Sequence, residues 1–371
     1  MNLAVFLTRG YDLSFWKKNG TLKREFDYYK ILEKKNFKIT FVSYGTKFSD
    51  ELLIQNSNFK ILNKPKWMPL LLYSLALPFI HYKELKKIDI IKTNQIFGTL
   101  EAFYCSIFFS KPLYSRSGYI ASSKASYSDL SFLFKLLIYI EEFVACKFSK
   151  TISVSSKYSI NHLSKKYNIS KKKFLLLYNF VDSIFFSNNI KKKKFNKKQL
   201  KVCFVGRLVH SKQPMHLFRI IKDFNNISLH ILGDGPLLPE LKKESIKLQN
   251  KIFFYKKTNN KKVFKFMKDK DILLFPTLEE GNSKVILEAM SSGLIVLTNN
   301  IECNRELINH RYNGFLINNN NIDLYKKYLK YIIKNKKSQY RLSLRASLFA
   351  KRKFSKKNFL KIELKQYKKC S

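Results

Sequence analysis

Cysteine is scarce in this 371-residue sequence: there are five, an odd number, scattered along the chain. Cys105, Cys146, Cys203, Cys303 and Cys370 lack the paired spacing of metal ligands and outline no disulfide framework. A small secreted domain held together by disulfides is therefore excluded. We expect these cysteines to be reduced residues of a cytoplasmic protein.

Long hydrophobic runs are also missing. The apolar run within residues 1–10 is too short for a signal peptide and lacks a basic region before it, so it is interpreted as a first β-strand. The longest apolar stretch, residues 67–80, is interrupted by Pro69 and Pro78 and falls short of the about 20 residues that cross a bilayer. No transmembrane helix is predicted.

Acidic residues are few: 26 Asp and Glu stand against 71 Lys and Arg, which gives a formal net charge of +45. A dedicated nucleic-acid-binding protein more often concentrates its basic residues in one arm or face, whereas here the lysines follow the whole length. We interpret the charge partly as a composition bias and partly as attraction to an anionic surface such as phospholipid headgroups. Nucleic-acid binding stays open as an alternative that only the charge suggests.

Hydrophobic residues make up 45% of the chain, and the length favours two domains with a core each. Strand-like and helix-like runs alternate in both halves, which indicates parallel sheets with crossover helices. The predicted fold class is α/β with two doubly wound, Rossmann-like domains. The boundaries are an N-terminal domain at 1–186, a basic linker at 187–199, a C-terminal domain at 200–354, and a basic C-terminal helix at 355–371 that packs back on the N-terminal domain.

Two glutamates flank the start of a predicted helix in the second half. Residues 271–275 are interpreted as a buried strand, and the helix that follows has Ser283 as its N-cap and Gly293 just beyond its end. Glu280 lies in the loop before this helix and Glu288 within it. Because open parallel sheets bind ligands at the carboxyl ends of their strands, both carboxylates are candidates to accept hydroxyl hydrogens of a ribose and a sugar. The alternative is a solvated loop acid and a surface helix residue.

Three further motifs follow predicted strands or begin helices. Gly206 and Arg207 begin a loop that ends at Lys212, and these two basic residues could clamp an anion. The turn Gly233-Asp234-Gly235 has a simple structural explanation, with the approach of backbone amides to a nucleotide as the alternative. Gly20 precedes a helix. One interpretation is that it leaves space for a ligand, either an acceptor or a donor phosphate; the alternative is a simple helix start.

Together with Glu306-Leu-Ile and residues 313–317, these motifs closely resemble the retaining nucleotide-sugar glycosyltransferases of family 4 (glycosyl transferases group 1). That family has the GT-B fold, in which two Rossmann-like domains face each other across a cleft. The resemblance is good over residues 201–333. In the first half it is looser, through Gly20 and residues 178–182.

The resemblance implies a role for each matching residue. Arg207 and Lys212 correspond to the pair that grips the donor diphosphate and stabilises it as a leaving group, Glu288 to the acid that holds the ribose, and Glu280 to the acid near the donor sugar. The other implied donor-binding residues are glycines and their neighbours: Gly206, Gly233, Asp234, Gly235, Gly281, Asn282 and Ser283. The resemblance also implies that no metal or other cofactor is needed and that the departing phosphate accepts the acceptor's proton.

The first half departs from the family at one position. Many relatives carry a histidine near the donor sugar, and the comparable stretch here, residues 114–119, has none. Arg116 is the candidate substitute. Residues 67–73 and 130–148 are apolar and flanked by lysines, which is typical of a membrane-bound surface; packing in the core explains them equally well.

The predicted function is that of a cytoplasmic enzyme, with peripheral attachment to the inner face of the membrane as a further hypothesis. It would transfer a hexose-type sugar from a nucleotide diphosphate sugar to a saccharide or lipid-linked acceptor, in surface polysaccharide or lipopolysaccharide biosynthesis. The alternatives are a nucleic-acid-binding protein and another GT-B enzyme, a nucleotide-sugar epimerase or a sugar phosphorylase.

Overall fold

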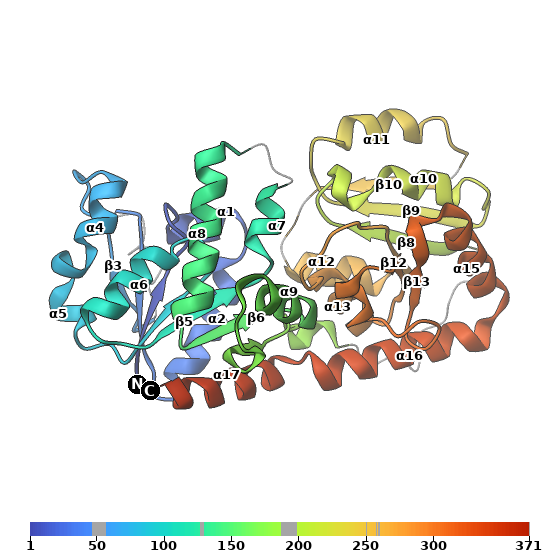
Figure 1. Cartoon of the computed structure of the whole chain (residues 1–371). Helices are drawn as coiled ribbons and strands as arrows, with labels where there is room; N and C mark the ends of the chain where they lie inside the picture. Colours follow the sequence, from blue (N-terminus) through green and yellow to red (C-terminus); the bar gives the residue numbers. More distant parts are fainter. Residues whose placement is uncertain are drawn as a thin grey trace. The chain divides into compact units, whose positions relative to one another are not determined.

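The computed structural model describes residues 1–46, 57–126, 130–186, 199–249, 251–256, 258 and 260–370. Almost all of the predicted linker at 187–199 lies outside these residues. The chain forms two compact units: unit 1 consists of residues 1–177 and the carboxyl-terminal segment from Ile362, and unit 2 of residues 178–361 (Figure 1). Residues 178–186, which the sequence analysis assigned to the first domain, therefore belong to unit 2.

Unit 1 contains a parallel sheet of seven strands in the order β3-β2-β1-β4-β5-β6-β7. Its strands are β1 (Asn2–Phe6), β2 (Lys38–Val42), β3 (Lys60–Leu62), β4 (Ile90–Thr93), β5 (Leu113–Ser117), β6 (Thr151–Val154) and β7 (Phe174–Leu176). The central strand β1 pairs with β2 on one side and with β4 on the other. The direction in which successive strands are added to the sheet therefore reverses between β1 and β4, and open sheets bind ligands at such a reversal.

Helices cover both faces of this sheet because alternate residues of each strand point to opposite sides. Phe41 of β2 packs against Tyr29 and Phe26 of α2 on one face. Phe6 and Val42 share a core with α4 and α6 on the other. The helices of unit 1 are α1 (Leu13–Lys18), α2 (Leu22–Glu33), α4 (Leu70–Ile80), α5 (Tyr82–Leu85), α6 (Thr99–Phe108), α7 (Ala121–Ser126), α8 (Phe132–Phe148), α9 (Lys157–Tyr167) and the end of α17 (Lys356–Cys370).

A buried ion pair ties the end of α17 to the sheet of unit 1. Lys92 of β4 and Glu363 of α17 are fully buried, with 2.9 Å between Nζ and Oε1. Lys92 also donates to the hydroxyl of Tyr367 at 2.6 Å, and the hydroxyl of Tyr28 donates to Glu363. Burial alone raises the pKa of Glu363, but the positive charges of Lys92 and Arg116 outweigh it and lower that pKa. Burial also lowers the pKa of Lys92, and Glu363 opposes that shift, so each partner stabilises the charge of the other.

Unit 2 contains a parallel sheet of six strands in the order β10-β9-β8-β11-β12-β13, so its reversal lies between β8 and β11. The strands are β8 (Leu200–Val205), β9 (Ile227–Leu232), β10 (Lys251–Tyr255), β11 (Ile272–Phe275), β12 (Ile295–Asn299) and β13 (Phe315–Ile317). Strands β9, β11 and β12 are buried along their whole length, as expected where helices cover both faces.

The α-helices of unit 2 are α10 (Met215–Ile221), α11 (Leu238–Ser245), α12 (Asn260–Lys268), α13 (Lys284–Ser291), α14 (Glu302–Arg305), α15 (Ile322–Lys334), α16 (Lys336–Lys353) and the beginning of α17. Helix α16 supports α13: the hydroxyl of Ser343 donates to the carbonyl oxygen of Gly293 at 2.6 Å, and that of Ser347 to Ser291 at 3.3 Å. Ala346 and Ala350 are fully buried. These small side chains let the two helices approach closely.

The sequence analysis missed several elements, of which α4 matters most. Pro69 and Pro78 do not interrupt the apolar stretch: Pro69 is the N-cap of α4, and Pro78 lies in its last turn. The helix tolerates the first proline because no intrahelical hydrogen bond is needed there. Helix α1, strand β3 and strand β13 were also missed. Among the described residues, no helix is long and apolar enough to cross a membrane.

The ion pair between Lys92 and Glu363 gives a stability prediction. Glu363→Ala leaves the Lys92 ammonium buried without its partner, so we expect the free energy of unfolding of unit 1 to fall by about 3–5 kcal/mol. The chain's two tryptophans, Trp16 and Trp67, both lie in unit 1, so urea unfolding followed by tryptophan fluorescence reports on this unit. The double replacement Lys92→Met with Glu363→Leu is the matched control and should recover most of the loss. Equal losses in the single and double variants would contradict this role.

Candidate functional site

The candidate residues of unit 2 lie at the reversal of its sheet. The loop after β8 carries Gly206, Arg207 and Lys212, and the loop after β11 carries Glu280. These two strands are neighbours. The two loops therefore leave the same edge of the sheet, side by side, where open parallel sheets bind their ligands.

An ion pair joins the two loops. The ammonium group of Lys212 lies 2.6 Å from Oε1 of Glu280. It also donates to the carbonyl oxygen of Glu279 at 2.7 Å and to the hydroxyl of Thr277 at 3.2 Å. The sequence analysis singled out Lys212 and Glu280 separately but missed Thr277, the polar residue that comes directly after the buried strand and Pro276. These contacts fix the position of the lysine charge at the edge of the sheet.

Arg207 differs from Lys212 in its surroundings. Its side chain is exposed, and no hydrogen bond or ion pair joins it to another described residue. The guanidinium group presents five N–H donors in a planar arrangement that suits phosphate oxygens. Of the two predicted basic residues, one is therefore held by the protein and the other is open to solvent.

The Gly233-Asp-Gly turn packs against the loop after β8. A Cβ atom on Gly233 would lie 1.9 Å from the carbonyl oxygen of Gly206, and one on Gly235 would lie 2.5 Å from that of Leu208. The amide of Leu208 donates to the carbonyl oxygen of Asp234 at 2.9 Å. Both glycines are thus required by the contact between two backbones. The structural explanation of this motif accounts for the glycines without any ligand.

Helix α13 carries the second glutamate. Ser283 caps the helix, its hydroxyl accepting from the amide of Ile286, and Gly293 follows its end with φ +75°, both as predicted. Glu288 is buried, and one of its carboxylate oxygens lies 3.1 Å from the ammonium of Lys284. It is therefore not the exposed helix residue of the alternative interpretation.

The segment after β7 holds the loop before α13 in place. The amide of Asn179 donates to Oδ1 of Asn282 at 2.9 Å, and its side-chain amide donates to the carbonyl oxygen of Asn282 at 2.8 Å. The hydroxyl of Tyr178 donates to Glu306 at 2.7 Å. These hydrogen bonds bring together three segments of unit 2 that the family resemblance singled out: residues 178–182, residues 281–283 and Glu306. Gly281 lies between Glu280 and Asn282 in the same loop.

The two candidate residues of unit 1 have different surroundings. A Cβ atom on Gly20 would meet nothing within 4 Å, so the space beside it is open, but helix α1 separates Gly20 from the end of β1. Arg116 lies in β5, and its guanidinium is within electrostatic reach of two carboxylates. Burial alone lowers the pKa of Arg116, but Glu25 and Glu363 outweigh it and raise the pKa. The positive charge of Arg116 is therefore compensated by carboxylates within the protein.

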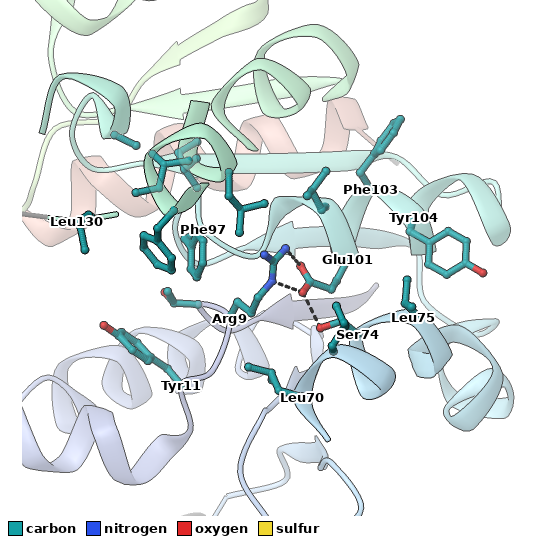
Figure 2. Close-up of a pocket in the computed structure, with 18 of the residues that line it drawn as sticks. Arg9, Tyr11, Leu70, Ser74, Leu75, Phe97, Glu101, Phe103, Tyr104 and Leu130 are labelled. Atoms are coloured by element: carbon teal, nitrogen blue, oxygen red, sulfur yellow. Dashed lines mark hydrogen bonds and ion pairs between the residues drawn. The ribbon is translucent and has the colours of Figure 1, made fainter. Parts of the chain in front are cut away.

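The sequence analysis missed a charged cluster at the reversal of the unit 1 sheet. Arg9, in the loop after β1, contacts Glu101 of α6 through two nitrogens and lies 2.6 Å from Glu141 of α8 (Figure 2 shows the contact with Glu101). Glu141 also accepts from the amides of Gly98 and Thr99. Burial raises the pKa of Glu141 to about 7, although Arg9 opposes it. The position of Arg9 after the first strand was the available signal.

Metal ligands do not gather in the described part of the chain: no group of three or more His, Cys, Asp or Glu side chains is placed to hold an ion. All five cysteines are free and buried.

Comparison with known proteins identifies a matching family and several relatives. Residues 185–348 match the family Glycosyl transferases group 1. An uncharacterised 41.2 kDa protein in the cps region of Klebsiella pneumoniae is 28% identical over 67% of this chain and 70% of that protein. The UDP-Gal:alpha-D-GlcNAc-diphosphoundecaprenol alpha-1,3-galactosyltransferase of Escherichia coli is 33% identical, but over only 32% of this chain and 33% of that enzyme.

A solved structure covers the chain almost completely. HepE of Anabaena in complex with UDP-glucose superimposes with a TM-score of 0.72 over 99% of both chains, at 16% identity. The GT-B fold predicted from the sequence is confirmed. The family match and the relatives support the predicted class, a glycosyltransferase, and give no support to a nucleic-acid-binding protein or an epimerase.

The contact between Gly233 and Gly206 gives a test of the loop packing. Gly233→Ala places a methyl group against a backbone oxygen, so we expect a loss of about 3 kcal/mol in the stability of unit 2. Hydrogen exchange of β8 and β9 measured by mass spectrometry should accelerate. Gly20→Ala is the control: with open space around it, only its positive φ of +71° should cost stability, about 1–2 kcal/mol. Unchanged exchange in Gly233→Ala would exclude the close packing.

The raised pKa of Glu141 gives a prediction for pH. The ordinary pKa of this carboxyl is 4.5 and the folded value about 7. Between these values the folded state keeps a proton that the unfolded chain releases, so this residue makes the free energy of unfolding fall as pH rises. We expect Glu141→Gln to gain stability relative to the natural protein from pH 4.5 to 7, measured by urea unfolding with tryptophan fluorescence. A constant difference across this interval would contradict the shift.

Proposed function

We propose that this chain is a retaining, metal-independent glycosyltransferase that moves a sugar from a nucleotide diphosphate sugar to a saccharide or lipid-linked acceptor. The observation that supports it most is the ion pair between Lys212 and Glu280 at the reversal of the unit 2 sheet, inside the segment that matches Glycosyl transferases group 1. We place the reaction in the biosynthesis of a surface polysaccharide or lipopolysaccharide, since relatives come from a cps region and act on a diphosphoundecaprenol-linked sugar.

In this proposal the two basic residues bind the donor diphosphate. Arg207 is exposed and free to take a bidentate position on phosphate oxygens, while Lys212 is already held at the edge of the sheet. Their charges stabilise the diphosphate as it leaves, which is the contribution that a divalent cation makes in other enzymes. The proposal of metal independence rests on this pair.

The carboxylates and the loop before α13 then hold the sugar and the ribose. Glu280 lies beside Lys212, which puts it near the sugar end of a bound diphosphate. Glu288 follows about one turn into the helix, where we place the ribose hydroxyls. Asn282 is fixed by Asn179, so the backbone of residues 281–283 is preorganised next to the N-terminus of α13. A helix N-terminus favours bound phosphate.

The transfer itself is proposed to occur on one face of the sugar. The bond between the anomeric carbon and the diphosphate oxygen breaks, the acceptor oxygen bonds to the same face, and the acceptor's proton passes to the departing phosphate. This transfer needs no protein side chain as a base. It fits a site whose side chains are proposed to bind phosphate and hydroxyl groups. Gly20 and Arg116 stay candidate contacts from unit 1, although internal carboxylates already account for the charge of Arg116. Attachment to the inner face of a membrane is part of the proposal.

Nucleotide binding gives the first test. We expect one nucleoside diphosphate from a panel to raise the midpoint of thermal unfolding equally with magnesium and with EDTA. At a concentration 100-fold above Kd, binding adds about 2.7 kcal/mol of stability. A rise that requires magnesium would contradict metal independence, and a rise with DNA but with no nucleotide would contradict the function.

Substitutions test the residue roles. Lys212→Ala and Glu288→Ala should each lower sugar transfer by about 10²–10³-fold, because each removes a contact made at the reacting diphosphate or at the donor. Lys247→Ala removes another unit 2 lysine from an ion pair of the same length, 2.6 Å to Glu244, and serves as the matched control. Transfer by Lys212→Ala at the rate of the control would overturn its role. Proton NMR of the product's anomeric configuration tests retention.

A further inference from the structure

The sheet of unit 1 has a cavity of about 1080 Å³ at its own reversal (Figure 2). The cavity is lined by the loop after β1 with Thr8 and Arg9, by the loop after β4 with Ile96 and Phe97, and by helices α4, α6 and α8. It therefore lies at the carboxyl ends of the central strands, the place where an open parallel sheet binds its ligand. All of the residues that line the cavity belong to unit 1.

The walls of the cavity are mostly apolar, although Tyr11, Tyr104 and Tyr119 also line it. Leu70 and Leu75 come from α4, Ile107 from α6, and Phe134 and Ile138 from α8. A free saccharide would have to bury most of its hydroxyl groups against apolar side chains, and each hydroxyl left without a hydrogen bond costs about 1–3 kcal/mol. An alkyl or isoprenoid chain would gain about 0.8 kcal/mol for each CH₂ group that it buries.

The polar side chains at the floor already satisfy one another. Arg9 contacts Glu101, and the hydroxyl of Ser74 donates to the same carboxylate at 2.8 Å (Figure 2). Glu141 lies on the other side of Arg9. With two carboxylates around one guanidinium, the floor offers no excess positive charge to an anionic headgroup. A phosphate group is therefore excluded from the floor, and only the chain of a lipid suits the interior.

The apolar surface continues outside the cavity. Helix α4 contains no charged residue, and Leu71 and Leu75 of this helix are 75% and 61% exposed. Phe132 and Leu133 at the start of α8 are also largely exposed. Core packing, the alternative in the sequence analysis, accounts for the buried side chains of these segments, such as Tyr73 and Ala145, but not for the exposed ones. Soluble proteins rarely expose such a contiguous surface without a binding role.

The segments around this surface carry several lysines, and the one acid beside them among the described residues, Asp12, is engaged as the N-cap of α1. Helix α1 carries Lys17 and Lys18, Lys66 precedes α4, and Lys135 lies in the first turns of α8. The acidic residues of α4, α6 and α8 are only Glu101, Glu141 and Glu142, and all three are buried. An apolar cavity with lysines outside it complements an amphiphile that has a hydrocarbon chain and an anionic headgroup.

We propose that this cavity binds the hydrocarbon chain of a lipid-linked acceptor, with the phosphate of the acceptor outside among the lysines. This inference rests on the proposed function and narrows it, since a saccharide acceptor without a lipid would leave the cavity empty. The chain enters between α4, α6 and α8, and the sugar to be extended is held at the carboxyl edge of the unit 1 sheet. Helices α4 and α8 contact the bilayer in which the acceptor is anchored.

The test uses farnesyl phosphate as a soluble probe and methyl phosphate as the same headgroup without the chain. Isothermal titration calorimetry with the full chain should show binding of farnesyl phosphate below its aggregation concentration and none of methyl phosphate. Leu75→Asp and Ile107→Asp put a carboxylate into the wall at positions exposed by 61% and 62%, so folding should be kept. Each should weaken binding of farnesyl phosphate at least tenfold.

The matched control is Ile246→Asp, which makes the same kind of change at a residue of unit 2 that is 85% exposed. It should bind the probe as the natural protein does. Equal binding by the control and by Leu75→Asp and Ile107→Asp would overturn the proposal. So would binding to anionic phospholipid vesicles without any binding of the soluble probe, since the apolar surface would then only adsorb to bilayers.

Nucleotide binding separates this proposal from the proposed function. The wall variants should keep the thermal shift with the nucleoside diphosphate, because the donor residues lie in unit 2. If the probe binds but no nucleotide shifts the unfolding midpoint, the cavity binds lipid and the proposed glycosyltransferase function is contradicted. If a nucleotide shifts the midpoint but the probe does not bind, the proposed function is kept and lipid binding in the cavity is contradicted.

Discussion

In both sheets the strand order reverses once, beside the first strand of the sheet, and this single constraint decides where chemistry is placed. Parallel strands present all of their carboxyl ends at one edge, and crossover helices cover the faces, so that edge is where side chains from distant parts of the sequence meet. Lys212 and Glu280 meet there in unit 2 across 68 residues, and Arg9 and Glu101 in unit 1 across 92.

The close packing of loops at this edge has an energetic consequence. Gly233 can contact the carbonyl oxygen of Gly206 only because it has no side chain, and that contact lets the loops after β8 and β9 support each other. With the backbone so constrained, Lys212 is held by Glu280 and by the carbonyl oxygen of Glu279 before any ligand arrives. Positioning a charge in advance lowers the cost of reorganisation when charge develops in a reaction.

The sequence was informative where local signals and the fold agree. The alternation of strand-like and helix-like runs correctly predicted two parallel sheets with crossover helices. Ser283 and Gly293 marked the ends of α13 correctly because a cap and a positive φ leave direct traces in the sequence. Helix α4 was missed because prolines were taken as interruptions, although Pro69 is compatible with a helix start. The partners of Lys212 and the cluster around Arg9 depend on long-range contacts, which no local pattern specifies.

The two reversals carry opposite chemistry, and this difference explains why the family resemblance is uneven along the chain. In unit 2 the loops after the strands carry charged side chains at fixed positions, Arg207, Lys212 and Glu280, so the motifs are short and specific. In unit 1 the corresponding edge is a largely apolar cavity, and the charged residues that line its described part, Arg9 and Glu101, pair with each other. Many combinations of Leu, Ile and Phe build such walls equally well, since packing depends on volume more than on identity. An apolar site therefore leaves no short motif in the sequence, and only the folded arrangement of α4, α6 and α8 reveals it.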